Sequence, residues 1–340
     1  MVSVGIIGAS GFTGAELLRI AAQHPHFEIT YATGDSQAGV RAAALYPSLA
    51  AAYPDLIFEA FDEERAQGLD LVFLGLPHEA SMALAPRLVG NVSCVVDLSA
   101  AYRLKDATQY LIYYGFVHDQ PGLLANAVYG LPELHRDELK GASLVATPGC
   151  YVTAATLALR PFVEAGVIET TGVIVDAVSG VTGAGRKADY GYSFATVDEN
   201  FAAYGLQDHR HTPEMEQEIG AQLLFTPHLA PMNRGILATC YARPTAGTSV
   251  STASLLELMR TRWAGEPFMV VADGLPSTKA TLGSNAVHVT ARYDERTNTV
   301  IAIAALDNLA KGASGGAVQS ANIALGLEET AGLTRVGVAP

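Results

Sequence analysis

Cys150 stands where a cysteine can act as a nucleophile. It follows a Thr-Pro-Gly turn at the end of an apolar segment, and the residues after it have the composition of a helix. A thiol at the start of a helix meets unpaired backbone N–H groups and the positive end of the helix dipole, which favour the reactive thiolate. Cys94 and Cys240 lie inside apolar, strand-like segments and are expected to be inert core residues. Cys150 is therefore predicted to capture an acyl group.

Two histidines are candidates for the acid or base that a thiolate needs. His209 and His211 frame an arginine just before an expected helix, with Thr212 as its N-cap and Pro213 as its first residue. Glu214 could orient an imidazole, and we also place it among the candidates for substrate binding. The His-x-His spacing also suits a metal, and the pair could be surface residues without a role. Because no further ligands accompany the pair at a matching spacing, we expect no metal site.

A glycine-rich turn near the N-terminus is suited to binding a dinucleotide. Its three glycines are spaced three apart, between an apolar run at 2–7 and a helix-forming segment at 15–23. Such a turn brings the backbone close to a pyrophosphate, and the helix offers free N–H groups to the anion. A turn without a ligand is the competing interpretation, which the strand before it and the helix after it disfavour. The expected cofactor-binding residues here are Gly8, Ser10, Gly11, Phe12, Thr13 and Gly14.

The segment after the second expected strand bears on the choice between NAD and NADP. Asp35 lies near the position where an acidic residue binds the ribose 2′-hydroxyl of NAD. Ser36 and Arg41 could instead hold the 2′-phosphate of NADP. These residues by themselves leave both cofactors open.

Two arginines follow polar or glycine-rich segments where an anionic substrate could bind. Ser99 and Arg103 come after an expected strand of the first domain, at the sheet edge where ligands bind in such folds. Arg186 ends the glycine-rich run at 179–186 in the second domain. All three are predicted to bind substrate, although either arginine could equally form a structural ion pair.

The pattern of strands and helices predicts two domains, as does the length of 340 residues. In the first part, apolar strand-like segments alternate with helical ones, which indicates a parallel, doubly wound sheet. Its expected strands are 2–7, 27–32, 69–74 and 92–98, and its expected helices are 15–23 and 81–88. After Cys150 we expect helices at 151–165, from Pro213 and at 310–326, strands at 173–179 and 236–242, and a hairpin of 287–293 with 299–306.

Charge and cysteine content narrow the class of protein. The chain carries 21 basic and 34 acidic residues, a net charge of −13, and no basic cluster that could follow a phosphate backbone. We therefore expect no nucleic-acid partner. No apolar run is long enough for a membrane span. Three cysteines, an odd number, suit free thiols in a reducing compartment, so we expect a cytoplasmic protein.

The order of these motifs resembles the N-acetyl-gamma-glutamyl-phosphate reductases of the longer type, a family of arginine biosynthesis. The matching segments run nearly from end to end: 8–16, 74–78, 97–104, 129–133, 147–153, 179–186, 209–214 and 307–312. The resemblance implies an α/β fold, with an N-terminal Rossmann-type parallel sheet completed by the C-terminal helix. It also implies an inserted α+β catalytic domain like that of aspartate-semialdehyde and glyceraldehyde-3-phosphate dehydrogenases. We place the dinucleotide-binding domain at 1–148 and 307–340, and the catalytic and oligomerisation domain at 149–306.

The resemblance also implies a reaction, a cofactor and an assembly. The reaction is the NADPH-dependent reduction of N-acetyl-L-glutamyl 5-phosphate to N-acetyl-L-glutamate 5-semialdehyde and phosphate, through a thioester on Cys150. One histidine of the His-Arg-His segment lies beside the cysteine in the family. Further NADP(H) contacts are expected at Gly75, Pro77, Gly183, Asn308 and Lys311, and the chain is expected to form a homodimer or homotetramer.

The chain departs from the family pattern at one position, and three other functions are alternatives to the one that the resemblance implies. Family members often carry Arg or Lys after the second strand, where Asp35 would repel a 2′-phosphate unless Arg41 compensates. The related aminoadipyl-phosphate reductases of lysine biosynthesis, which use a carrier protein, tend to lack the Pro-Gly-Cys-Tyr form and the run at 179–186. A non-catalytic dinucleotide sensor is a second alternative. A Cys/His acyl transferase or hydrolase that needs no hydride donor is a third, which the glycine turn disfavours.

Overall fold

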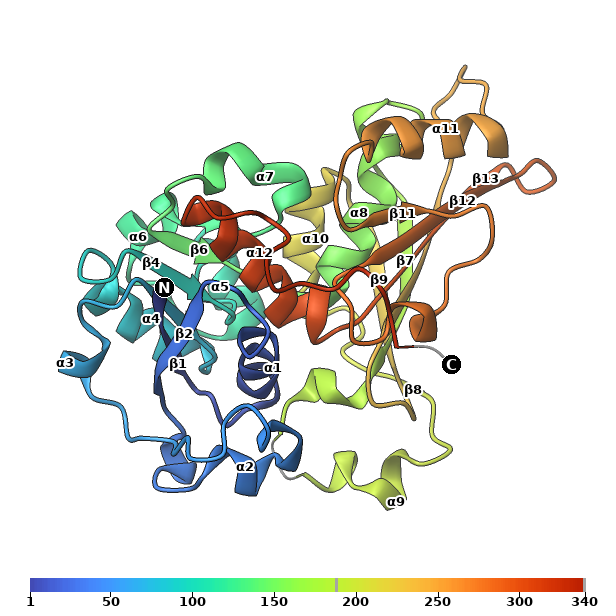
Figure 1. The fold of residues 1–340 in the computed structure, drawn as a ribbon. Coiled ribbons are helices and arrows are strands. Elements are labelled where there is room, and N and C mark those ends of the chain that lie inside the picture. The colour runs from blue at the N-terminus through green and yellow to red at the C-terminus, as the bar shows by residue number, and fades with distance from the viewer. Residues whose placement is uncertain (187–188, 339–340) are drawn as a thin grey trace. The chain divides into compact units, whose positions relative to one another are not determined.

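The computed structural model describes residues 1–186 and 189–338 (Figure 1). The described residues form two compact units, and each is considered by itself. The first unit comprises Met1–Thr108, Val117–Pro148 and Ala313–Leu333. The second comprises Gln109–Phe116, Gly149–Gly312 and the segment from Thr334 onward. Residues 307–312, which we placed with the first domain, group with the second because Asp307 and Asn308 bond to residues of that unit, as described below.

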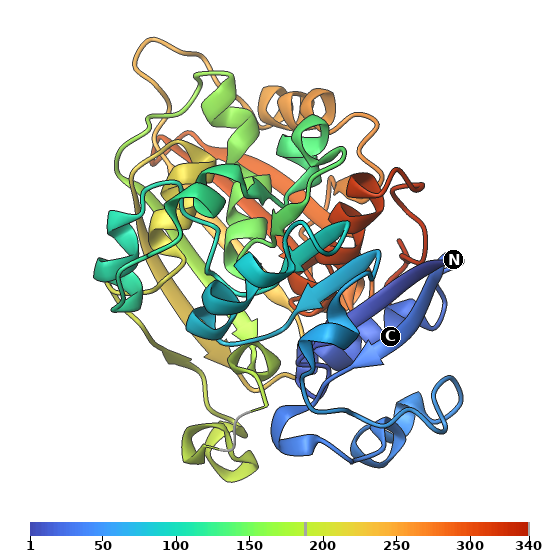
Figure 2. The same ribbon diagram turned by 90° about the vertical axis from the view of Figure 1, so that its left-hand side faces the viewer.

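The first unit is built on a six-stranded sheet in which every neighbouring pair is parallel, with the order β2-β1-β3-β4-β6-β5 (Figure 2). Its strands are β1 (Val2–Ile7), β2 (Phe27–Ala32), β3 (Leu71–Leu74), β4 (Cys94–Asp97), β5 (Val128–Tyr129) and β6 (Leu144–Ala146). Every residue of β3 and β4 is buried, as expected for parallel strands covered by helices on both faces. The predicted parallel sheet is confirmed.

Seven α-helices belong to the described residues of the first unit. They are α1 (Phe12–Ala21), α2 (Ala42–Leu45), α3 (Glu63–Ala66), α4 (His78–Leu88), α6 (Pro121–Asn126), α7 (Pro132–Leu139) and α12 (Gly315–Ala324). Although α12 comes from the end of the chain, it contacts α1, α7 and β4, and all its residues are buried. The C-terminal helix therefore completes the first unit, as predicted.

The helix predicted at 310–326 begins with a wider turn than we expected. Residues Ala310–Ser314 form a π-helical turn, and α12 follows it. The Asp307 carboxylate accepts hydrogen bonds from the N–H groups of Leu309 and Ala310, while the Gly312 N–H donates to the carbonyl oxygen of Asp307. This last bond spans five residues, so the turn is wider than in an α-helix.

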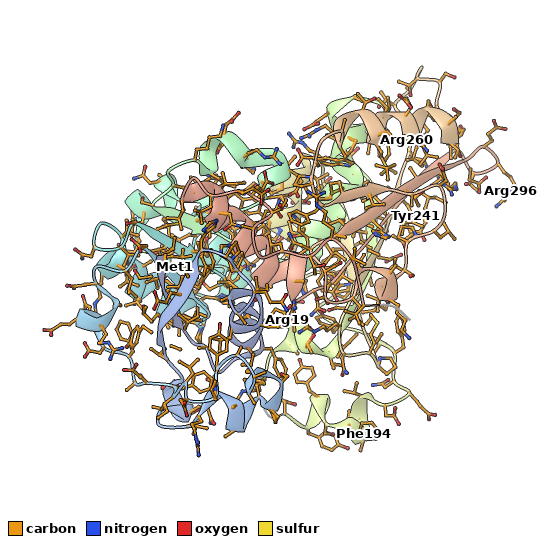
Figure 3. The ribbon with its side chains drawn as sticks, viewed as in Figure 1. Met1, Arg19, Phe194, Tyr241, Arg260 and Arg296 are labelled. Atoms are coloured by element: carbon orange, nitrogen blue, oxygen red, sulfur yellow. The ribbon has the colours of Figure 1, made fainter. Side chains whose placement is uncertain are left out.

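The second unit contains a seven-stranded mixed sheet with the order β11-β12-β13-β10-β7-β9-β8. Its strands are β7 (Val173–Gly180), β8 (Ala202–Ala203), β9 (Leu223–Ala230), β10 (Ile236–Ala242), β11 (Met269–Val271), β12 (Val287–Asp294) and β13 (Thr299–Leu306). The predicted hairpin is confirmed, since β12 and β13 pair antiparallel, and Figure 3 shows Arg296 in the loop that joins them. The pairs β11–β12 and β7–β9 are parallel.

Helices cover one face of this second sheet. α8 (Cys150–Glu164) contacts β10 and β13, and α10 (Thr212–Ile219) and α11 (Thr252–Arg262) contact α8. α5 (Thr108–Tyr114) and α9 (Phe194–Val197) are the remaining α-helices among the described residues of this unit. Along β10 the residues alternate between buried and partly exposed, so the helices cover only one side of the strand. Tyr241, labelled in Figure 3, belongs to the partly exposed set.

In the part of the chain that the structure describes, no helix combines the length and the apolar character needed to cross a membrane.

Candidate active site and nucleotide-binding turn

The α8 helix begins at Cys150 itself, one residue earlier than predicted. Gly149 is its N-cap and provides no side-chain cap for the first N–H groups of the helix. These groups and the helix dipole stabilise negative charge at the helix start. Cys150 is partly exposed, whereas Cys94 and Cys240 are buried. Burial raises the pKa of the Cys94 thiol to about 12, and burial raises the pKa of Cys240 further.

Gly149 is the point where two distant segments meet. A Cβ atom on Gly149 would lie 2.5 Å from Nε2 of His211, so a glycine is needed there for the imidazole to fit. The N–H of Gly149 donates a hydrogen bond of 2.8 Å to Oε1 of Glu214, which is fully buried. His211 and Glu214 thus both contact the residue that precedes Cys150, so the structure brings the His-Arg-His segment to the start of α8.

His209 lies in an enclosure of aromatic rings behind His211. Its ring centroid is 4.8 Å from that of His211 and 5.0 Å from that of Phe225, and the rings of Tyr151 and Tyr204 also meet it in edge-to-face geometry. Its Nδ1 accepts a hydrogen bond of 3.1 Å from the N–H of His211. Burial and, to a smaller extent, the charge of Arg210 lower the pKa of His209 to about 4, while Asp208 opposes the shift. His209 is therefore uncharged near neutral pH.

The expected cap of α10 was wrong by one residue. His211 is the N-cap, Thr212 is the first helical residue and Pro213 the second. The N–H groups of both His211 and Thr212 bond back to His209, which forms a tight turn before the helix. The turn consequently shifts the N-cap position from Thr212 to His211.

The segment after β13 brings another group of predicted residues to the second unit. Oδ1 of Asn308 accepts a bond of 2.7 Å from the Gly235 N–H, and its Nδ2 donates to Oγ1 of Thr182 at 2.9 Å. A Cβ on Gly183 would lie 3.9 Å from the same Nδ2. Asn308 and Lys311 are each only 2% exposed. Gly183 and Asn308 are thus neighbours, which the sequence did not require.

Gly312 continues this segment to the cysteine. A Cβ atom on Gly312 would lie 2.9 Å from the Cβ of Cys150, so the chain passes very close to this cysteine. The Asp307 carboxylate supports the segment by accepting from the Gly283 N–H at 2.7 Å and by pairing with Arg234. Arg186, in contrast, is exposed.

The predicted substrate residues of the first unit bond to their own surroundings. The guanidinium of Arg103 donates to the carbonyl oxygens of Thr147 at 2.6 Å and of Leu98 at 3.0 Å. Ser99 donates its N–H and its hydroxyl to the carboxylate of Asp97, whose pKa is raised by burial. These bonds shape the loop after β4, and a contact of Ser99 or Arg103 with substrate stays a prediction.

The glycine turn between β1 and α1 is packed backbone against backbone. Gly8 has a φ of 92°, and a Cβ atom on it would lie 2.4 Å from the carbonyl oxygen of Gly75. A Cβ on Gly14 would lie 2.5 Å from Cα of Ala9. Around Gly11 there is space, because the nearest atom to an added Cβ would be 3.5 Å away. Gly11 is the N-cap of α1 and provides no side-chain cap, so the turn suits a pyrophosphate.

Other predicted nucleotide residues surround this turn. A Cβ on Gly75 would lie 3.5 Å from Oγ1 of Thr13, and the hydroxyl of Ser10 donates to the carbonyl oxygen of Gly34 at 3.2 Å. Phe12 opens α1, and Pro77 is the exposed N-cap of α4. At the end of β2, Asp35, Ser36 and Arg41 are all exposed.

Several residues of the site were not found by reasoning on the sequence. They are Gly149 and Gly312, which make the close approaches, and the aromatic residues Tyr151, Tyr204 and Phe225 around His209. The Pro-Gly pair before Cys150 signals a turn, but the imidazole that requires the glycine is about sixty positions later in the chain. Among the described residues, no group of three or more His, Cys, Asp or Glu side chains is arranged to hold a metal ion.

Comparison with protein families and with curated proteins gives a consistent result. Residues 3–142 match the semialdehyde dehydrogenase NAD-binding domain, and residues 150–308 match the semialdehyde dehydrogenase dimerisation domain. An N-acetyl-gamma-glutamyl-phosphate reductase of Symbiobacterium thermophilum is 46% identical over 345 residues, covering 99% of this chain and 98% of the relative. The protein of the same name from Geobacter sulfurreducens is 45% identical, with both chains covered completely.

Solved structures show the same fold. Aspartate semialdehyde dehydrogenase II of Vibrio cholerae superposes with a TM-score of 0.70 at 15% identity, covering 95% of this chain and 98% of that one. The Candida albicans aspartate semialdehyde dehydrogenase, solved with NADP, gives the same TM-score, identity and coverage. The predicted fold class is therefore confirmed. With relatives of this identity along its whole length, the chain belongs to the family of N-acetyl-gamma-glutamyl-phosphate reductases.

Proposed function

We propose that this chain reduces N-acetyl-L-glutamyl 5-phosphate to N-acetyl-L-glutamate 5-semialdehyde, with release of phosphate and oxidation of NADPH. The observation that carries the proposal is the packing at the start of α8, where the imidazole of His211 lies on Gly149 beside Cys150. The family to which the chain belongs favours the acetylglutamyl substrate over the aminoadipyl substrate. It also favours a catalytic protein over a sensor or a hydrolase.

The first unit has a site that fits a dinucleotide. The turn from Gly8 to Gly14 would hold the pyrophosphate, because its glycines exclude side chains and the N–H groups of α1 lack a side-chain cap. Gly75, Pro77, Gly183, Asn308 and Lys311 complete the proposed set of contacts. When bound, the reduced nicotinamide supplies the hydride that converts a thioester into an aldehyde. Ser36 and Arg41, both exposed at the end of β2, are proposed to favour NADP over NAD.

Cys150 begins the reaction as a thiolate. Its sulfur attacks the carbonyl carbon of the acyl phosphate, the bond from that carbon to the phosphate oxygen breaks, and inorganic phosphate leaves. The product is a thioester between Cys150 and the acetylglutamyl group. The start of α8 supports this step because the N–H groups of its first turn and the helix dipole stabilise negative charge on the sulfur before attack.

His211 is the proposed acid/base. After the thioester carbon has been reduced, its oxygen takes a proton from the imidazolium form of His211, which leaves a neutral imidazole. The imidazole then removes the proton again as the carbon–sulfur bond breaks and the aldehyde forms. His209 is unsuited to this exchange because burial lowers its pKa to about 4 and its Nδ1 already accepts the N–H of His211. Glu214 holds Gly149 and, with Ser99, Arg103 and Arg186, is proposed to contribute to substrate binding.

The partly exposed face of the second sheet is proposed to join copies of the chain as a homodimer or homotetramer. On this face Leu237, Thr239 and Tyr241 of β10 lie beside Val178, Asp176 and Ile174 of β7. The match of residues 150–308 to a dimerisation domain supports this assignment. The three free cysteines support a reducing compartment, and we propose the cytoplasm.

The function is tested by running the reaction in reverse. Purified protein is given N-acetylglutamate 5-semialdehyde, phosphate and NADP, and the formation of NADPH is followed at several pH values. Cys150→Ser should abolish turnover and leave NADPH binding intact, while Cys94→Ser, which changes a buried core cysteine, should retain it. NAD and the aminoadipate semialdehyde analogue serve as competing substrates. Turnover by the Cys150→Ser variant would refute the thioester, and faster turnover of the analogue would refute the acetylglutamyl substrate.

A further inference from the structure

Tyr204 connects an exposed segment of the second unit to the residues around the cysteine. It lies directly after β8, between α9 and His209, and its N–H donates to the carbonyl oxygen of Pro227 on β9. Large side chains of this segment are exposed: Tyr190 is 84% exposed, and Phe194, which is labelled in Figure 3, is 81% exposed. Tyr204 is itself 40% exposed, but its hydroxyl donates a hydrogen bond of 3.1 Å to the hydroxyl of the buried Tyr151.

Tyr151 is the neighbour of Cys150 in the first turn of α8. It is only 2% exposed, and its hydroxyl donates to the carbonyl oxygen of His228 on β9 at 3.0 Å. The two phenols therefore form a chain from Tyr204 through Tyr151 to the backbone of β9. Burial raises the pKa of Tyr204 to about 12, a shift that the hydrogen bond with Tyr151 opposes and the charge of Cys150 supports, and burial also raises the pKa of Tyr151. Both phenols remain protonated donors at the pH of catalysis.

The same tyrosine also forms one wall of the enclosure around His209. The rings of Tyr204 and His209 meet edge to face with centroids 5.6 Å apart, and Tyr151 and Phe225 form further walls. A Cβ on Gly205, which has a φ of 54°, would lie 3.2 Å from Cδ2 of His209, so the backbone after Tyr204 follows the imidazole closely. The titratable and charged groups facing His209 are Tyr151, Tyr204, Asp208, Arg210 and His211.

These contacts form a continuous path to the nucleophile. His209 fixes the backbone of His211 by accepting its N–H, and the ring of His211 lies on Gly149. We propose that Tyr204 is a positioning residue for the acid/base: its ring and hydroxyl hold His209 and Tyr151, and these set the place of His211 beside Cys150. The inference rests on the proposed function for its kinetic consequences. The position of His211 matters because a misplacement of about 1 Å can lower a rate about 100-fold.

The experiment compares two substitutions of Tyr204 with the same substitutions of Tyr190, which lies on the same segment and is 84% exposed. Tyr204→Phe removes only the hydroxyl, and Tyr204→Ala removes the ring as well. For each full-length variant, kcat, KM for the semialdehyde and the pH profile of kcat are measured in the reverse reaction. The rate at which iodoacetamide alkylates Cys150 is measured across pH in parallel. Cys94 and Cys240 are buried and should not react in the folded chain. Urea unfolding shows whether each variant is folded.

We expect Tyr204→Ala to lower kcat about 10-fold or more, with KM changed less than about 3-fold, and to move the pH profile of kcat. Tyr204→Phe should lower kcat about 2- to 10-fold, the range for one lost hydrogen bond, and the Tyr190 variants should match the unchanged chain. If Tyr204→Ala does not fold, Tyr204→Phe decides the matter. A Tyr204→Phe variant with unchanged kcat, pH profile and alkylation rate overturns the proposal.

The alkylation measurement separates this inference from the proposed function. If the unchanged chain catalyses no reduction, the proposed function fails. A changed pH dependence of Cys150 alkylation in the Tyr204 variants then still supports the positioning role, and an unchanged one refutes it.

Discussion

The site of the first unit is formed mainly by backbone, whereas the candidate active site of the second unit is formed mainly by side chains. In the first unit the nucleotide-binding turn is made of backbone from a short stretch, and the glycines at Gly8 and Gly14 exclude side chains from it. In the second unit the candidate active site is made of side chains, and Cys150 and His211 come from segments about sixty residues apart. A backbone site tolerates little change in its glycines, whereas a side-chain site depends on helices and loops that hold each group. This difference predicts distinct responses to substitution.

Gly149→Ala should have the largest effect and should affect the second unit alone. The added methyl would lie 2.5 Å from Nε2 of His211, so the imidazole must move away from the start of α8. We expect kcat to fall about 100-fold with NADPH affinity unchanged. Steady-state kinetics and a fluorescence titration with NADPH measure the two quantities. Gly274→Ala is the matched control, because no atom lies within 4 Å of the added methyl. Equal activity of both variants would contradict the placement of His211.

Gly11→Ala and Gly14→Ala separate binding from folding in the first unit. The methyl of Gly14→Ala would meet Ala9 Cα at 2.5 Å, and we expect the free energy of unfolding to fall by about 1–3 kcal/mol. Gly11→Ala meets only one atom, at 3.5 Å, and should leave stability unchanged within about 0.5 kcal/mol. Its methyl would keep a pyrophosphate away, so NADPH affinity should fall about 10-fold. Unaltered NADPH affinity in Gly11→Ala would place the dinucleotide elsewhere.

Glu214→Ala tests the bond that joins α10 to the start of α8. The buried carboxylate accepts the Gly149 N–H at 2.8 Å, and its loss leaves that donor without the acceptor. We expect unfolding by urea to show a loss of about 1–3 kcal/mol. Glu214→Gln retains a carbonyl oxygen at the same place and should be clearly more stable than Glu214→Ala. Similar stabilities of the two variants would show that the bond contributes little.

Near neutral pH the titration of buried histidines should have the smallest of these effects, and both units contribute to it. Burial lowers the pKa of His24, which bonds to Asn322, in the first unit, and burial lowers the pKa of His209 to about 4 in the second. In the unfolded chain these histidines take up protons near pH 6.5, whereas in the folded chain their lowered pKa means that they take up protons only at lower pH. The free energy of unfolding should therefore be highest above about pH 6.5 and fall as the pH decreases towards 4.

His209→Gln identifies the share of the second unit in this pH dependence. Urea unfolding between pH 4 and 7 should show that the free energy of unfolding changes less with pH in His209→Gln than in the unchanged chain. The reason is that one histidine whose pKa is lowered by folding has been removed. An unchanged slope would show that His209 is protonated in the folded protein.

Local sequence was sufficient for much of the fold and for the parts of the site within one turn. The run at 2–7, the glycines after it and the alternation of strands and helices predicted the first sheet, because each depends on neighbouring residues. The position of Cys150 at a helix start was also predicted correctly, to within one residue. Where boundaries differed, as at His211 and in the π-helical turn Ala310–Ser314, side-chain bonds from His209 and Asp307 had shifted them.

The sequence by itself determined which groups this protein possesses: a cysteine at a helix start, a pair of histidines and a glycine turn. Only the tertiary structure decided how they are used. It places His211 on Gly149, encloses His209 in aromatic rings, and brings Gly312 to Cys150. The physical reason is that an imidazole's protonation and position depend on its burial and on partners that are distant in the chain, and no local pattern specifies these.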